Sequence, residues 1–177
     1  MNIEGNSSTN FSNAYLLYAD LTDADLYGAD LTDAYLGYAD LTGANLGSAD
    51  LTGANLWSAD LTDANLFDAD LTDANLESAD LEDADLQYAD LTGAWMYGAD
   101  LTDANLRSAD LTGADLGYAD LTDANLEDAD LTGAYLGSAD LKFADFGSAT
   151  VTDAVFTGTY WHQTIWTDGD RYDSNQA

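Results

Sequence analysis

Aspartate is the residue type in this chain whose number and spacing could support chemistry. The 177 residues include 34 acidic and only three basic side chains, and the net charge is −31. Regularly spaced carboxylates could act as acid and base, bind a cation, or present an ordered negative surface. Two series, which we call the acidic ladders, each repeat every twenty residues. They are Asp20, Asp40, Asp60, Asp80, Asp100, Asp120 and Asp140, and Asp30, Asp50, Asp70, Asp90, Asp110 and Asp130.

Catalytic chemistry has few other residues to draw on. The chain has a single histidine, His162, and no cysteine, and no nucleophile–histidine–acid arrangement surrounds the histidine. The glycine motifs that bind phosphates or dinucleotides and the loops that bind calcium are also missing. Carboxylates on a flat surface lack a pocket that would shift their pKa values. We therefore expect a protein that is not an enzyme and that holds no metal or cofactor.

The residues that must position the aspartates form an array with a period of five. Alanine occupies every fifth position from Ala14 to Ala154, and a large apolar residue follows each alanine two positions later. Of the 29 such central positions between residues 16 and 156, 25 are leucine. A period of five makes no stripe on an α-helix and alternates between the faces of a straight strand. A chain that bends after every pentapeptide removes both problems, because all alanines and leucines then enter one core.

Units such as Ala59-Asp60-Leu61-Thr62-Asp63 and Ala64-Asn65-Leu66-Phe67-Asp68 resemble those of the pentapeptide-repeat proteins. The resemblance implies an all-β fold, a right-handed quadrilateral parallel β-helix with four pentapeptides per turn and about seven coils. The segment 161–169 is similar to the closing segment of some cyanobacterial members. We expect a polar leader or cap at residues 1–13, the β-helix at 14–158, and a C-terminal cap with a frayed tail at 159–177.

Four units per coil would sort the pentapeptides onto four faces, which we name by their central residues. Face one begins at Leu21, face two at Leu26, face three at Leu31 and face four at Leu16, and each continues with every twentieth residue. The acidic ladders then lie on faces one and three, on opposite sides of the rod. Threonine columns that start at Thr22 and Thr32 accompany them.

Two interpretations of the acidic ladders stay open. The carboxylates can satisfy the bent backbone, while their charge keeps the exposed sheet from aggregating. Regular charge on a stiff rod also resembles the phosphates of DNA. The resemblance to quinolone-resistance members implies an acidic DNA mimic that binds DNA gyrase or another nucleic-acid-binding protein, without direct binding of nucleic acid. Two features count against mimicry. The repeat array has no inserted loops, which matter in several gyrase-protecting members, and its charge is spread nearly all round the rod instead of lying on one DNA-like surface. A lesser alternative is an ice-binding or water-ordering surface of threonines.

Face four is the least uniform surface and carries seven of the eleven tyrosines. Exposed aromatic side chains on one side of a protein are typical of a contact surface, although stacking between coils would also explain them. We therefore predict a non-catalytic structural or protein-interaction scaffold whose partner is an unknown protein. The candidate interaction residues are Tyr15, Tyr35, Trp57, Trp95, Tyr97, Tyr118 and Tyr135.

An aromatic group near the C-terminus also has two interpretations. It can cap the last coil, or, by resemblance to gyrase-binding members, form the interface of a homodimer. Its residues are Phe143, Phe146, Phe156, Trp161 and Trp166. No apolar run approaches the roughly 20 residues that cross a bilayer, and residues 1–13 lack the apolar region of a signal peptide. We expect no membrane association and a cytoplasmic location, with a processed periplasmic or lumenal form as the alternative.

Overall fold

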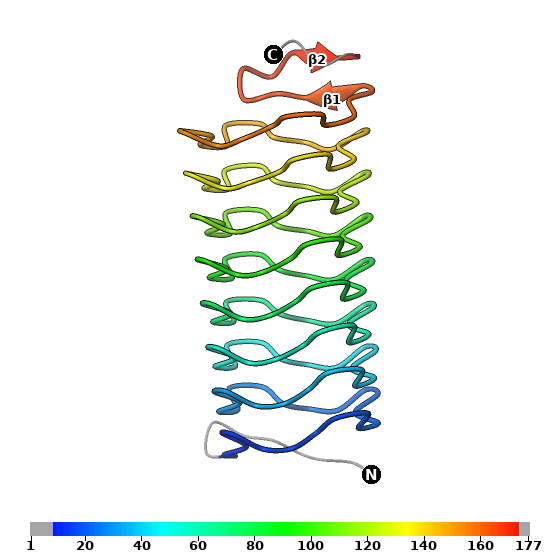
Figure 1. Ribbon diagram of the computed structural model, residues 1–177, viewed down its shortest axis with the longest axis vertical. Coiled ribbons are helices and arrows are strands. Elements are labelled where there is room, and N and C mark those ends of the chain that lie inside the picture. Colours follow the sequence, from blue (N-terminus) through cyan, green and yellow to red (C-terminus); the bar gives the residue numbers. More distant parts are fainter. Residues whose placement is uncertain (1–8, 174–177) are drawn as a thin grey trace.

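The computed structural model describes residues 9–173, which form a rod of coils stacked in chain order from one end of the rod to the other (Figure 1). Two short strands, β1 (Thr164–Ile165) and β2 (Arg171–Tyr172), form an antiparallel hairpin at the C-terminal end. No α-helix occurs within the described residues. The predicted right-handed quadrilateral β-helix is confirmed.

Parallel one-residue bridges join each coil to the next with a constant offset of twenty residues, from Asn10↔Asp30 to Asp145↔Ile165. A typical rung uses both backbone groups of the bridging residue. The amide of Tyr35 donates to the carbonyl oxygen of Ala14 at 2.8 Å, and the carbonyl oxygen of Tyr35 accepts from the amide of Leu16 at 2.8 Å. Because the offset never changes, residues twenty positions apart lie above one another at about the strand spacing of 4.8 Å.

Each pentapeptide ends in a tight turn. The amide of every alanine donates to the carbonyl oxygen of the central residue three positions earlier, as from Ala19 to Leu16 at 3.0 Å. The residue before each repeat alanine has a positive φ, as type II turns require, and the series of positive φ values at every fifth position runs from 13 to 163. Glycine adopts this conformation without a steric penalty, as at Gly113, and aspartate tolerates it better than most residues, as at Asp103. The variable fourth and fifth positions of the repeat are therefore the corners.

Leucine and alanine fill the interior of the rod. The central residues from Leu31 to Leu141, Met96 included, have 0% of their surface exposed. Burying one leucine side chain stabilises a fold by about 2 kcal/mol, so the array is the main source of stability. The layers at the two ends are less deeply buried. Phe11 and Leu16 are half-buried at one end, and Phe156 is half-buried at the other.

The described part of the predicted leader already has the geometry of a coil. Asn10 bridges Asp30, and the amide of Phe11 donates to the carbonyl oxygen of Asp30 at 2.7 Å. Residues 1–8 of the predicted leader and 174–177 of the predicted tail lie outside the described residues. At the C-terminal end, Tyr160 bridges Asp140 in the column of face one and Ile165 bridges Asp145 in the column of face two, so β1 also contributes the last rung of face two. Among the described residues there is no helix with the length and apolar character to span a bilayer.

Candidate functional site

The acidic ladders run along faces one and three, where the bridges stack Asp20 on Asp40 and Asp30 on Asp50. In all thirteen ladder aspartates, Oδ1 accepts a hydrogen bond from the backbone N–H two residues later, at N···O distances of 2.9–3.3 Å. The carboxylates thus satisfy the backbone at the corners. The hydroxyls of Thr22, Thr32 and Thr132 donate to the same oxygens, so their hydrogen atoms are already used within the protein.

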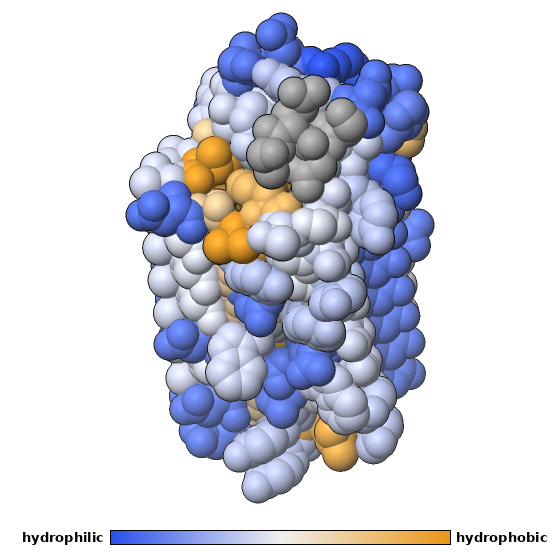
Figure 2. Space-filling model, turned by 45° about the horizontal axis from the view of Figure 1, so that its top comes forward, coloured by the Kyte–Doolittle hydropathy of each residue, from blue (hydrophilic) through white to orange (hydrophobic). Residues whose placement is uncertain are grey.

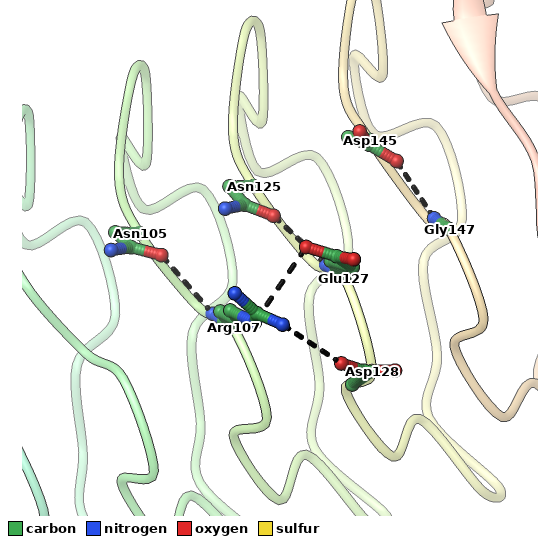
Figure 3. A network of polar contacts seen from close by, with 7 residues as sticks. All are labelled: Asn105, Arg107, Asn125, Glu127, Asp128, Asp145 and Gly147. Carbon is green, nitrogen blue, oxygen red and sulfur yellow. Dashed lines mark hydrogen bonds and ion pairs between the residues drawn. The ribbon is translucent and has the colours of Figure 1, made fainter.

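Asparagine makes the same turn contact on face two. Oδ1 of Asn105 accepts from the N–H of Arg107 at 3.3 Å, just as Oδ1 of Asp145 accepts from the N–H of Gly147 at 2.8 Å (Figure 3). The two residue types share a carbonyl-type acceptor and differ in charge. The hydrogen bond at the corner therefore does not depend on a negative charge.

Basic side chains in the coils are paired with acids. Arg107 extends toward the next coil, with Nε 3.6 Å from Oε2 of Glu127 and Nη2 3.4 Å from Oδ2 of Asp128 (Figure 3). Lys142 donates to Asp140, and this hydrogen bond raises the pKa of Lys142. Exposed pairs of this kind contribute little stability. In the part of the chain that the structure describes, no group of three or more His, Cys, Asp or Glu side chains could hold a metal ion.

Carboxyl pKa values respond to their immediate neighbours. Hydrogen bonds from the side chain and then the backbone of Thr42 lower the pKa of Asp40. Glu82 interrupts the threonine column of face one. Desolvation, followed by repulsion from Asp80 and Asp100, raises the pKa of Glu82. Crowding of charge is therefore evident where a glutamate replaces threonine beside the ladder.

Face four differs from the ladder faces in both charge and composition. Its units carry nine outward aromatic side chains and only two acids, Glu77 and Asp115. The expectation that charge is spread nearly all round the rod is therefore too simple. The coil with Asn75 and Glu77 divides the aromatic residues into two groups. The N-terminal aromatic cluster is Tyr15, Tyr18, Tyr35, Tyr38 and Trp57, and the C-terminal aromatic cluster is Trp95, Tyr97, Tyr118 and Tyr135.

Rings of the N-terminal aromatic cluster stack from coil to coil. Tyr15 lies on Tyr35 with centroids 4.6 Å apart and planes 5° apart, and Tyr18 lies on Tyr38 at 5.1 Å and 8°. Trp57 packs edge-on against Tyr38 at 4.7 Å. Stacking covers the inner ring of each pair more than the outer one, since Tyr15 is 82% exposed and Tyr35 43%. Contacts between coils therefore account for part of this cluster.

The C-terminal aromatic cluster is more open. Tyr97 and Tyr118 meet at 5.2 Å with their planes tilted by 52°. Trp95 is 62% exposed and makes no ring contact with another described aromatic residue. Asp115 lies in the column between Trp95 and Tyr135. Asp115 is not among the predicted interaction residues, although its departure from the asparagines at 55 and 75 in the same column is a signal that the sequence contains.

Four of the five residues predicted for the C-terminal aromatic group meet at the end of the rod. Ring centroids of Phe146, Phe156, Trp161 and Trp166 lie 4.7–6.2 Å apart in their contacting pairs. Phe143 lies apart from them, edge-on against His162, and is 40% exposed. Figure 2 shows strongly hydrophobic atoms gathered toward this end and hydrophilic atoms in columns along one side of the rod. Contact among the four rings is what a cap over the last coil requires.

The family profile of pentapeptide repeats matches residues 7–33, 29–66, 64–103 and 119–158, in eight copies. The chain belongs to the pentapeptide-repeat family. It is 39% identical to HetL, a pentapeptide repeat protein involved in heterocyst differentiation regulation from the cyanobacterium Nostoc sp. strain PCC 7120. That match covers 92% of this chain and 78% of HetL, with a TM-score of 0.49. Rfr23 of the cyanobacterium Cyanothece 51142 is 35% identical over 55% of this chain and 63% of its own, with a TM-score of 0.48.

QnrB1, a plasmid-mediated fluoroquinolone resistance protein, matches 92% of this chain and 83% of its own in a trypsin-treated form, with a TM-score of 0.58. The two sequences are 20% identical, so this likeness shows the fold. Among curated proteins, none matches the chain significantly.

Proposed function

We propose that this protein is a non-catalytic scaffold that binds a partner protein through face four. The observation that carries the proposal is the concentration of exposed aromatic side chains on a face with two acids, in a chain with 34. Interfaces are enriched in tyrosine and tryptophan and depleted in aspartate and glutamate. A rod with a rigid, regular backbone presents such side chains without the cost of ordering a loop when the partner binds.

Stacking alone does not explain the exposure of these residues. A ring that only stiffened the coils would be covered on both sides by the coils above and below. Trp95 is 62% exposed and Tyr118 60%, far from either end of the rod. Large aromatic residues that remain open to solvent are typical of binding hot spots.

A photo-crosslinking experiment tests this proposal. Benzoylphenylalanine is placed at Trp57 or Tyr118 on face four, and at Tyr88 on face two as the control, because Tyr88 is also an exposed aromatic residue. We expect the same partner to be cross-linked from both face-four positions and not from Tyr88. With the purified partner, Trp95→Ser should weaken binding by about tenfold, the effect of a typical hot-spot side chain. Equal cross-linking from Tyr88 would contradict a face-four contact.

A second function, mimicry of DNA, is favoured by one observation. The ladder aspartates stack at every coil along two opposite faces, and each accepts the backbone hydrogen bond of the turn with Oδ1, as at Asp60 and Asp90. A protein with a basic DNA-binding groove, such as DNA gyrase, would recognise this surface by charge. Its binding should weaken steeply with salt and should not depend on Trp57 or Trp95. A supercoiling assay across a salt series checks this, with the ladder from Asp20 to Asp140 replaced by asparagine as the variant.

A further inference from the structure

One carboxylate of face four lies among aromatic rings. Bridges place Asp115 one coil from Trp95 and one coil from Tyr135 in the same column. A methyl group built on the neighbouring Gly117 would lie 3.0 Å from Cε1 of Tyr135, 3.2 Å from Cδ2 of Tyr97 and 3.1 Å from Oδ1 of Asp115. These three side chains therefore converge over Gly117, which has no side chain of its own to separate them.

The charge of Asp115 is not needed for the turn. Its Oδ1 accepts from the N–H of Gly117 at 3.0 Å. In the same column, Asn55 and Asn75 accept the equivalent hydrogen bonds at 3.1 and 3.0 Å without a charge. No described residue donates a hydrogen bond to Oδ2 of Asp115 or forms an ion pair with it. One charged oxygen is thus available to a ligand beside the exposed rings.

The combination of rings and carboxylate selects a cation with a flat shape. Aromatic faces attract cations, and the attraction strengthens when water is excluded. A guanidinium group can stack on a ring and donate two parallel hydrogen bonds to a carboxylate, whereas an ammonium group acts as a point charge. We propose that Trp95, Tyr97, Asp115, Tyr118 and Tyr135, which we call the Asp115 site, bind an arginine side chain of the partner protein. This inference rests on the proposed scaffold function and specifies the chemistry of its partner.

Charge complementarity favours a basic partner over a second copy of this chain. With a net charge of −31, the rod attracts a basic segment at long range and repels a second rod. A second copy would bring only three basic side chains, and Arg107 is already paired with Glu127 and Asp128. The arginine of a different, basic protein is therefore the occupant that the site fits.

The test uses the capped peptide acetyl-Gly-Arg-Gly-amide and its lysine counterpart as probes. Each is titrated into the ¹⁵N-labelled protein at about 0.15 M salt, which screens long-range attraction to the ladders. We expect saturable NMR shifts centred on the amide of Gly117 and the indole N–H of Trp95. The arginine peptide should bind several-fold tighter than the lysine peptide, roughly threefold or more, because only guanidinium stacks and pairs in a bidentate manner.

Variants separate the site from the general acidity of the rod. Asp115→Asn keeps the turn acceptor and should weaken binding of the arginine peptide by about tenfold, the usual effect of losing a charge-assisted hydrogen bond. Tyr97→Leu combined with Tyr118→Leu should remove the preference for arginine over lysine. The matched control is Asp145→Asn. It removes the same charge from an Asp-Xaa-Gly turn of the same geometry on face two and should leave binding within about twofold, as for a distant rim charge.

Either of two results would overturn the Asp115 site: shifts spread evenly along the ladders, or equal binding by the wild type and Asp115→Asn. The failure of this inference and of the scaffold function are distinguishable. If a partner is cross-linked from Trp57 and Tyr118 and Asp115→Asn does not change its binding, the scaffold function is supported and the arginine site is contradicted. If the arginine peptide binds at the Asp115 site but no partner is cross-linked from face four, the site is supported and the scaffold function is contradicted.

Discussion

Tyr15 stacks on Tyr35, one coil further along the rod, with ring centroids 4.6 Å apart and planes 5° apart. The separation is close to the 4.7–4.9 Å between hydrogen-bonded strands, so the backbone register itself sets the stacking distance. The two residues are also bridge partners. Any two aromatic residues twenty positions apart at an outward position can stack in this way, and face four uses that property repeatedly.

The stack of Tyr15 on Tyr35 should couple the stabilities of the first two coils. We expect Tyr15→Leu and Tyr35→Leu to be non-additive, with a coupling free energy of about 0.5–1 kcal/mol, the range for aromatic pairs beyond buried area. Hydrogen exchange of the Tyr35 amide, which donates to Ala14, measures opening at this point. Tyr15→Leu combined with Tyr135→Leu is the control and should be additive, because these residues are far apart in the stack. Additivity in both pairs would contradict the coupling.

The period of five was enough to predict a chain that bends after every unit around one core, because it constrains every unit in the same way. Leucine at each central position cannot reach a common core unless the chain turns after each unit, and the described coils turn at every fifth residue. The twenty-residue offset came from the family resemblance, and the bridges agree with it. Faces could therefore be assigned before any coordinates, including the ladders at Asp20 and Asp30.

The details of the candidate site could not be predicted, because they depend on side-chain rotamers and not on register. The sequence places Trp95 and Tyr135 on one face but does not say that Tyr97 and Tyr135 converge over Gly117. The sequence shows that Asp115 replaces the asparagine found at 55 and 75, but only the turn contacts show that its charge is not needed there. The hairpin of β1 and β2 is another feature that fading periodicity does not predict.

The hydroxyl of Thr42 should keep Asp40 ionised to a lower pH. Because hydrogen bonds from Thr42 lower the folded-state pKa of Asp40, they stabilise the fold above the unfolded pKa of about 3.9. That contribution is lost as the pH falls through the folded pKa. We expect Thr42→Val to move the pKa of Asp40 upward toward its ordinary value, and Thr42→Ser to leave it low. Carboxyl ¹³C NMR titration measures both, and an unchanged pKa in Thr42→Val would contradict the role of the hydroxyl.

Replacing Glu82 by threonine should stabilise the rod. Desolvation, together with repulsion from Asp80, Asp100 and their neighbours, raises the pKa of Glu82, so the ionised form is disfavoured in the folded state. Glu82→Thr removes that charge and completes the threonine column. The melting temperature should rise at neutral pH and low salt. The gain should shrink as salt screens the repulsion, and also below the pKa of Glu82, where the side chain becomes neutral. Glu77→Thr on face four, away from the ladders, is the control and should give a smaller change with little dependence on salt.

Corner residues with positive φ should respond to the loss or gain of a Cβ atom. Gly113 has a φ of 69° and open space where a Cβ atom would lie, so Gly113→Ala should cost about 1 kcal/mol from backbone strain alone. Gly93 has a φ of 67°, but a methyl group there would lie 2.5 Å from Oδ1 of Asp73. Gly93→Ala should therefore cost more than Gly113→Ala, because the aspartate side chain must also move.

Removing the side chain of Asp73 separates the two effects at Gly93. In an Asp73→Ala background, Gly93→Ala should cost the same as Gly113→Ala, because only the backbone term remains. The reverse change, Ser108→Gly, should stabilise the rod by up to about 1 kcal/mol, since Ser108 has a φ of 58°. Urea unfolding followed by circular dichroism measures all of these variants. If Gly93→Ala and Gly113→Ala cost the same free energy of unfolding while Asp73 is present, the contact between neighbouring corners does not determine which corners carry glycine.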